Sequence, residues 1–203
     1  MKLWGRLSSI NVRKAVWALQ EAGIPFERVD AGMAFGVVDT PAYRAHNPNG
    51  LVPLIDDDGF VLWESNAIVR YLCARENRLY PSDLHTRFTA EQWMDWQQTS
   101  LNRASGPAFV QWIRTPESQR NHDLIAQSVA ATEPLLDLLD QRLQQQAFVA
   151  GEQMSMADLP IACEVHRWWG LPQNRPHWPH LERWYAHMRQ HPGAVGVLDL
   201  PLS

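Results

Sequence analysis

Residues 47–65 read NPNGLVPLIDDDGFVLWES, and no other segment constrains the architecture as tightly. Two short apolar runs, 54–56 and 60–63, lie on either side of an Asp-Asp-Gly turn. An Asp-Gly pair between such runs is a strong signal for a β-hairpin. The segment therefore predicts two antiparallel strands joined by a tight turn.

Both ends of this hairpin carry candidate binding groups. Val52-Pro53 opens the first strand, where proline is tolerated because it has no N–H to donate to a central ladder. A cis bond at this proline is one way to turn the chain sharply and direct a backbone amide outward. Glu64-Ser65 follows the second strand and begins a helix predicted over 65–75, where backbone N–H groups and the dipole favour an anionic group.

The first half of the chain alternates strands and helices. Short apolar runs predict strands at 2–4 and 26–29, and a period near 3.6 residues predicts a helix over 11–22 between them. A threonine followed by a proline predicts a short helix over 41–46, before the hairpin. The order βαβ followed by αββα predicts a four-stranded mixed sheet with helices, an α/β domain over residues 1–78.

The second half predicts helices alone. Apolar residues at helical spacing cover 86–100 and 118–146, and a final helix is predicted over 179–190. The sequence MSMADL, residues 154–159, has the Ser-x-x-Asp pattern of a capping box before another apolar helix. Residues 86–203 are therefore expected to form an all-α domain.

Composition argues against several classes of protein. Of the 203 residues 45% are hydrophobic, and the formal net charge of −4 leaves no basic excess that would attract nucleic acid. No run approaches the roughly 20 apolar residues of a membrane helix, and the first residues lack the apolar stretch of a signal peptide. Cys73 and Cys163 fall inside predicted helices and are interpreted as buried apolar residues. We expect a cytoplasmic, soluble protein with neither a disulfide framework nor a metal site.

Two motifs carry a resemblance to a known family. The segment NPNGLVPLIDDDGFVLWESNAIVRYL, residues 47–72, and the capping box at 154–159 resemble those of the cytosolic glutathione S-transferases. The similarity extends over essentially the whole chain. It implies a thioredoxin-like N-terminal domain, an all-α C-terminal domain, and an enzyme that uses glutathione as co-substrate and needs no prosthetic group. It also implies a homodimer with two-fold symmetry.

The beginning of the chain narrows the resemblance. LWGRLSSINVRK, residues 3–14, is similar to bacterial members that carry a serine, in place of a tyrosine, after the first strand. This start and the segment around Phe35-Gly36 are similar to a bacterial subgroup that acts on small halogenated acids. The implied reaction is conjugation of the glutathione thiolate to a small electrophile, with loss of a leaving group such as halide.

The resemblance implies a glutathione site in the first half. Val52, followed by Pro53, would pair its backbone with the cysteinyl part of the tripeptide, and Glu64 and Ser65 would hold the γ-glutamyl amine and carboxylate. These residue types suit those groups, because a carboxylate attracts an ammonium group and a helix start attracts a carboxylate. The alternative is an ordinary helix cap at Ser65 and a favourable dipole charge at Glu64.

The residue before Val52 departs from the family pattern. Lysine or glutamine often holds the glycyl carboxylate there, whereas this chain has Leu51, whose side chain cannot. Arg13 or His46 would have to substitute, and Arg13 is included in the predicted glutathione-binding set.

Ser9 and Asn11 are the candidates for activating the thiol. A thiol with a pKa near ~8.5 is mostly protonated at neutral pH, and a donor at a helix start lowers that pKa. Ser9 stands four residues before Arg13, as in the serine-type members, and Asn11 matches relatives with an amide donor; Ser8 fits less well. The alternative is that Ser9 or Asn11 only caps the helix.

The second substrate is expected between the two halves, in a pocket with apolar walls and few polar groups. The candidates for this pocket are Met33, Phe35, Trp112 and Arg114. Two other functions remain open. One is glutathione-dependent reduction or deglutathionylation, in which Asn11 would matter more than Ser9. The other is a non-catalytic binding protein, which Leu51 favours.

Overall fold

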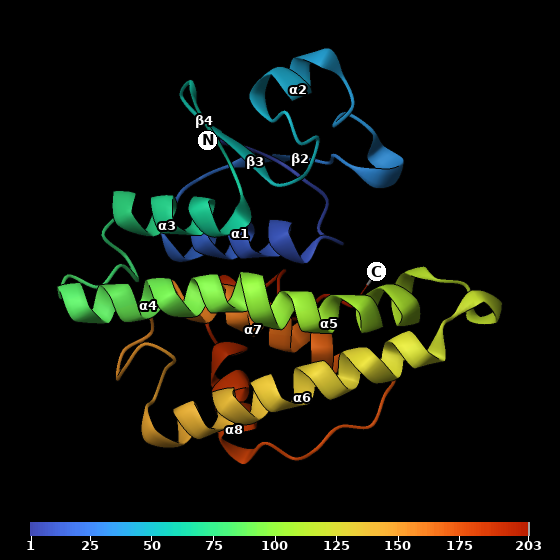
Figure 1. Cartoon of the computed structure of the whole chain (residues 1–203). Helices are drawn as coiled ribbons and strands as arrows, with labels where there is room; N and C mark the ends of the chain where they lie inside the picture. Colours follow the sequence, from blue (N-terminus) through green and yellow to red (C-terminus); the bar gives the residue numbers. More distant parts are fainter. Residues whose placement is uncertain (203) are drawn as a thin grey trace.

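The computed structural model describes residues 1–202 as two packed halves (Figure 1). The N-terminal half is built on a four-stranded sheet in the order β2-β1-β3-β4, in which β1 and β2 are parallel and the other pairs are antiparallel. The predicted mixed sheet is confirmed. Its strands are β1 (Lys2–Trp4), β2 (Glu27–Val29), β3 (Leu54–Asp57) and β4 (Phe60–Trp63).

The hairpin forms where the sequence predicts it. Asp57 pairs with Phe60, so the loop between the two strands consists of Asp58 and Gly59 alone. Both loop residues have positive φ, 51° and 95°, as a two-residue hairpin loop of type I′ requires. The turn therefore sets the register of the strands on either side of it.

The helices of the first half cover both faces of the sheet. α1 (Ile10–Glu21) and α3 (Ser65–Arg75) lie on the face toward the second half, and α2 (Pro41–His46) lies on the opposite face (Figure 1). Tyr43 of α2 packs there against Leu54 of the sheet. The sheet is thus covered by apolar residues on both sides.

The two halves share one hydrophobic core. Val12, Val16 and Leu19 of α1 are buried, as their helical spacing predicts. They belong to a single buried cluster that continues into the second half through residues such as Met94 and Leu159. The position of α1 is therefore determined by both halves, and α1 carries the candidate catalytic residues at its start.

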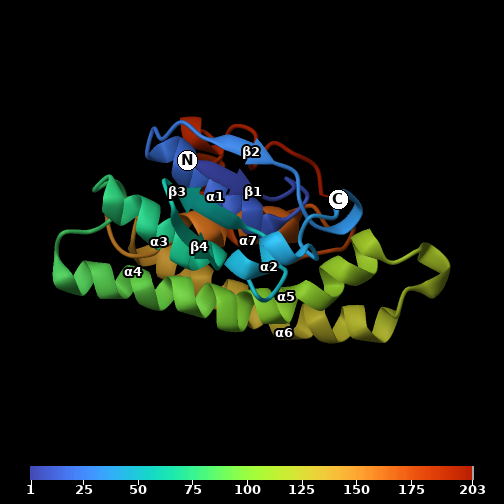
Figure 2. The same ribbon diagram turned by 90° about the horizontal axis from the view of Figure 1, so that it is seen from above.

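The second half begins with one long helical course, seen along its length in Figure 2. α4 (Leu84–Trp96) passes through a π turn, Gln97–Leu101, into α5 (Asn102–Phe109), and a second π turn, Val110–Arg114, ends the course. The prediction that this helix ends at residue 100 is wrong. Pro107 lies inside α5, where proline normally breaks a helix, but α5 packs along the helix formed by His122–Gln145, and this tertiary contact outweighs the local signal.

The remaining helices are α6 (His122–Gln145), α7 (Asp158–Trp169) and α8 (Pro179–Met188). The carboxylate of Asp158 accepts hydrogen bonds from the Ser155 N–H (2.9 Å) and the Ser155 hydroxyl (3.1 Å), so the predicted Ser-x-x-Asp pairing forms at the start of α7. Within residues 1–202, no helix combines the length and the apolar character needed to cross a membrane.

Candidate active site

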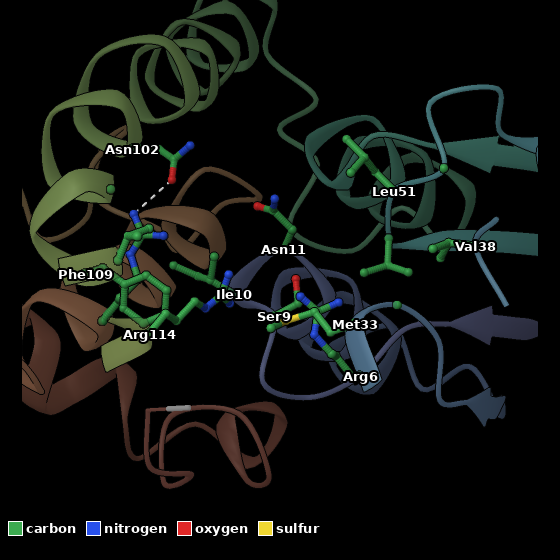
Figure 3. Close-up of a pocket in the computed structure, with 16 residues that line it drawn as sticks. Arg6, Ser9, Ile10, Asn11, Met33, Val38, Leu51, Asn102, Phe109 and Arg114 are labelled. Atoms are coloured by element: carbon green, nitrogen blue, oxygen red, sulfur yellow. Dashed lines mark hydrogen bonds between the residues drawn. The ribbon is translucent and has the colours of Figure 1, made fainter. Parts of the chain in front are cut away.

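A cavity of about 410 Å³, here named the interdomain pocket, lies between the loops of the first half and α5 of the second (Figure 3). In Figure 3, Arg6, Ser9 and Met33 lie on one side, and Phe109 and Arg114 lie on the other. Its lining consists of Arg6, Ser9, Ile10, Asn11, Gly32, Met33, Val38, Gly50, Leu51, Val52, Asn102, Gly106, Phe109, Val110, Arg114 and Arg167.

A smaller cavity of about 40 Å³, here named the side pocket, opens next to it. Asn11, Leu51 and Val52 line both cavities, so the two adjoin. The complete lining of the side pocket is Asn11, Asn47, Asn49, Leu51, Val52, Pro53, Trp63, Glu64 and Ser65. The fold thereby brings the predicted residues Val52, Pro53, Glu64 and Ser65 together.

Ser9 occupies the N-cap position of α1, but its side chain makes no capping hydrogen bond. The residue is 8% exposed and lines the interdomain pocket. Because the hydroxyl has no hydrogen-bond partner within residues 1–202, it is free to donate to an atom in the pocket. Ser8 instead lines a separate small cavity behind this loop.

Asn11 connects the start of α1 to the start of α3. Its Oδ1 accepts a hydrogen bond from the Ser65 hydroxyl at 3.3 Å, and Ser65 is 3% exposed. The Asn11 amide nitrogen has no partner in the described part of the chain, so it too is available as a donor at the junction of the two pockets.

The segment before β3 presents backbone groups to the pockets. The Val52-Pro53 bond is cis, and neither the N–H nor the carbonyl of Val52 has a backbone partner among residues 1–202. The Leu51 carbonyl is held by the Tyr43 hydroxyl (2.6 Å) and by Nδ2 of Asn47 (2.9 Å). Val52 is thus fixed from one side and is free to pair with an extended peptide.

Glu64 has a backbone conformation that non-glycine residues rarely adopt. Its φ is 71°, in the left-handed region, immediately before the first residue of α3. Such conformations are energetically costly and are concentrated at functional sites. The turn leaves the Glu64 side chain exposed beside the buried Ser65.

The interdomain pocket is strongly cationic. Arg6, Arg114 and Arg167 line it, and its lining contains no acidic residue. Within the described chain, no ion pair or hydrogen bond engages the guanidinium of Arg6 or of Arg114. Burial, and then the charge of Arg114, lowers the pKa of Arg6; burial, and then the charge of Arg167, lowers the pKa of Arg114. Two cationic side chains therefore face this cavity without a countercharge.

Arg167 is held by a buried polar network that crosses from the first half. Lys14 donates to Oε1 of Gln97 (3.0 Å), Gln97 donates to the Glu164 carboxylate (3.1 Å), and Glu164 pairs with Arg167. Burial lowers the pKa of Lys14 to about 8. The guanidinium centres of Arg114 and Arg167 lie 4.8 and 5.0 Å from the ring of Phe109, which orders this wall of the pocket.

Comparison with known proteins identifies this arrangement. A model described as "Glutathione S-transferase, N-terminal domain" matches residues 8–75, and one described as "Glutathione S-transferase, C-terminal domain" matches residues 101–192. The chain belongs to the glutathione S-transferase family. The predicted family, fold class and enzyme class, and glutathione as the co-substrate, are thereby confirmed.

Individual members of the family are similar along the full length of the chain. Glutathione S-transferase GstB of Escherichia coli is 36% identical over 205 residues, which cover 99% of each chain. The theta class glutathione S-transferase of Xanthomonas axonopodis pv. citri, solved with glutathione bound, is 41% identical. It superposes with a TM-score of 0.97 over 100% of this chain and 98% of its own. Glutathione S-transferase 1 of Zea mays is 26% identical over 98% and 96% of the two chains.

The structure places Arg13 outside both pockets, whereas the sequence predicted that it helps to bind glutathione. Arg13 is 5% exposed, and its guanidinium donates to the carbonyls of Leu7, Val197, Leu200 and Pro201. A side chain held in this way is not available to a carboxylate in either pocket. His46, the other proposed substitute for a basic residue at position 51, is exposed and lines neither pocket.

Only two of the four residues predicted for the second-substrate pocket line the interdomain pocket. Met33 and Arg114 do. Phe35 is 53% exposed and lies outside the lining, and Trp112 donates its ring N–H to Gln173 at 3.0 Å instead. On a helix that continues through the π turns to residue 114, Trp112 and Arg114 point in different directions, which a prediction ending the helix at residue 100 could not anticipate.

The sequence analysis missed most of the lining of the interdomain pocket, including four residues with polar or aromatic side chains, namely Arg6, Asn102, Phe109 and Arg167. Arg6 lies three residues before Ser9, so its place in the same loop was the one available signal. The other three come from α5 and α7, and no local pattern distinguishes them from ordinary helix residues.

Both cysteines are buried free thiols, as expected. Burial raises the pKa of Cys73 to about 12 and that of Cys163 to about 12. A thiolate is the reactive form of cysteine, so neither side chain is a nucleophile in this site.

Proposed function

We propose that this glutathione S-transferase conjugates glutathione to small electrophiles that carry a negative charge, and that halogenated carboxylic acids are the class to test first. The observation that carries the proposal is the pair Arg6 and Arg114, two guanidinium groups without a countercharge in the pocket that also contains the free Ser9 hydroxyl. A carboxylate suits such a pair because guanidinium groups bind planar anions through two donors.

Glutathione is proposed to bind across the side pocket. Glu64 attracts the γ-glutamyl ammonium group, and the Ser65 hydroxyl and the first N–H groups of α3 receive its carboxylate. The unpartnered backbone of Val52 pairs with the cysteinyl residue. The superposition with the glutathione-bound Xanthomonas structure supports this placement.

The cysteinyl sulfur then lies near the start of α1, where the side pocket meets the interdomain pocket. The Ser9 hydroxyl donates a hydrogen bond to the sulfur, and with the N-terminal end of the helix dipole it favours the thiolate. The thiolate attacks the carbon that bears the halogen, a carbon–sulfur bond forms, and the carbon–halogen bond breaks with its electron pair leaving on the halide. Arg114 holds the carboxylate of the acid during this displacement.

The proposal is tested by turnover. Iodide release from iodoacetate in the presence of glutathione should exceed the uncatalysed rate in proportion to the protein concentration. Iodide release at the uncatalysed rate, at all protein concentrations, would remove the proposed conjugation of haloacids.

Replacing Ser65 with alanine should weaken retention of the protein on immobilised glutathione. Loss of a hydrogen bond to a charged group costs about 1.5–3 kcal/mol, so binding should weaken roughly tenfold or more. Thr40→Ala is a matched control, since Thr40 caps the short helix α2 and lines neither pocket. Unchanged retention of Ser65→Ala would remove the γ-glutamyl contact from the proposal.

We further propose that the protein acts as a two-fold homodimer in the cytoplasm. Free buried thiols suit a reducing compartment, and large apolar side chains are exposed in both halves, among them Phe60 on β4 and Phe88 on α4. Light scattering should give a mass of about twice the 23.3 kDa of one chain. A mass of one chain at micromolar concentration would contradict the dimer.

A further inference from the structure

The last segment of the described chain runs along α1 in the opposite direction. Near the end of α1, Nε2 of Gln20 donates to the carbonyls of Gly193 (2.8 Å) and Val195 (2.9 Å). Near the start of α1, Arg13 donates to carbonyls further along the same segment. We name residues 193–202 the C-terminal strap.

Arg13 joins this strap to the loop that carries Ser9. Its NH1 donates to the carbonyls of Val197 and Leu200, both at 3.1 Å, and its NH2 donates to that of Pro201 at 2.6 Å. Its Nε donates in the other direction, to the Leu7 carbonyl at 2.7 Å. One buried guanidinium thus holds two segments that lie at opposite ends of the sequence.

The guanidinium of Arg13 has no carboxylate within ion-pair distance among residues 1–202. Backbone carbonyls accept all of its hydrogen bonds, and Asp199 of the strap attracts its charge from further away. A charged guanidinium is costly to bury without hydrogen bonds, and its planar set of N–H donors holds the accepting carbonyls in one geometry. His166 of α7 secures the strap independently, because its Nε2 lies 2.9 Å from the same Leu200 carbonyl. The strap is therefore a fixed anchor for Arg13.

The Ser9 hydroxyl depends on this anchor for its position. It makes no hydrogen bond of its own to the rest of the described chain, so the backbone of the loop sets the place from which it reaches into the pocket. Backbone hydrogen bonds hold Ser9 itself, from the Ser9 N–H to the Arg6 carbonyl (3.1 Å) and from the Arg13 N–H to the Ser9 carbonyl (3.1 Å). The Arg13 side chain adds the bond from Nε to the Leu7 carbonyl (2.7 Å), and removing it frees the peptide group two residues before Ser9.

We propose that Arg13 is a positioning residue for thiol activation, and that the C-terminal strap acts on the catalytic hydroxyl through it. This inference rests on the proposed role of Ser9. Arg13 lines neither pocket that would hold substrate, so its effect is expected on the ionisation of bound thiol and not on glutathione affinity.

Two variants test the connection from opposite ends. Arg13→Lys keeps the positive charge but loses the several N–H donors of the guanidinium group. Deletion of residues 199–203 keeps Arg13 but removes the Leu200 and Pro201 carbonyls that accept from it. Gln20→Leu is the matched control, since it removes two hydrogen bonds to the same strap at the far end of α1. Circular dichroism establishes whether each variant is folded. If the deletion variant does not fold, the milder Arg13→Lys variant tests the inference by itself.

The first measurement is the pKa of the thiol in the complex with glutathione, followed by thiolate absorbance. Arg13→Lys and the deletion should both raise this pKa toward the free value of ~8.5 and lower kcat at pH 7 about tenfold, while KM for glutathione stays within about twofold. The double variant should be no worse than the more severe single variant, because both act through one connection. Gln20→Leu should leave the thiol pKa unchanged.

The second measurement needs no glutathione. Hydrogen exchange of the Ser9 amide should accelerate about tenfold or more in Arg13→Lys and in the deletion variant, but not in Gln20→Leu. If exchange of the Ser9 amide accelerates but the thiol pKa does not change, then Arg13 does hold the loop, and the proposed role of Ser9 in activating the thiol is removed. Wild-type exchange and wild-type thiol pKa in folded Arg13→Lys would overturn the inference itself.

Discussion

Replacing Ser9 with alanine is expected to lower kcat/KM for conjugation roughly ten- to a hundredfold at pH 7, because one donor to the developing thiolate is lost. The structure makes this a clean substitution, since the hydroxyl neither caps α1 nor bonds to any other described residue. The fold should therefore be unaffected. The pKa of the bound thiol should rise, so the defect should be largest below that pKa and should shrink as the pH is raised above it.

Ser8→Ala is the matched control for this prediction. Ser8 lies next to Ser9 in the same turn, but its side chain lines a different cavity. It should retain nearly all of the activity. If instead Asn11→Ala abolishes activity and Ser9→Ala does not, the amide is the donor, and glutathione-dependent reduction becomes the better description of the chemistry. Asn11 has the position for this, since its amide reaches the junction of both pockets.

Replacing Arg114 with glutamine is expected to separate charged from neutral electrophiles. Iodoacetate and iodoacetamide have the same reacting carbon and leaving group but differ in charge. Loss of a charge-assisted hydrogen bond of about 1.5–3 kcal/mol should lower kcat/KM for iodoacetate roughly ten- to a hundredfold. The value for iodoacetamide should change less than about threefold. The measurement is the ratio of the two specificity constants, each corrected for the uncatalysed reaction with glutathione.

Arg120→Gln controls for the loss of a guanidinium group near the same turn of helix. Arg120 donates to the carbonyls of Gln111 and Trp112 and lies outside the pocket, so its removal should not alter the ratio. Equal losses with both electrophiles in Arg114→Gln would mean that Arg114 supports the wall around Phe109 without contacting a carboxylate. The same ratio measured for Arg6→Gln, on the opposite side of the pocket, then shows whether the pocket binds the carboxylate through Arg6.

The parts of the site that were predictable are those encoded by local signals. The Asp-Gly turn, the proline that opens β3 and the polar pair at the start of α3 each constrain the backbone within a few residues. The last two of these signals supply Pro53, Glu64 and Ser65 to the side pocket. Family resemblance added the proposed roles of Val52, Glu64 and Ser65, and the fold places all three around the side pocket.

The parts that were missed depend on segments far apart in the chain. Arg13 was expected to substitute for the basic residue missing at position 51, but its guanidinium is held by carbonyls 184 to 188 residues away. Phe109 and Arg167 reach the pocket only because α5 continues past Pro107 and because Glu164 holds Arg167 in place. Neither fact has a local signature, since both follow from how the helices of the second half pack.

The burial of both cysteines has a consequence for durability. Alkylating agents inactivate many proteins by modifying exposed thiolates, and an enzyme that consumes such agents meets them at every turnover. Cys73 and Cys163 are shielded from solvent and remain protonated, with pKa values of about 12. In an enzyme that takes up alkylating agents, as proposed here, no cysteine thiolate of the protein then competes with the thiol of bound glutathione, so the two cysteines resist modification by the substrate.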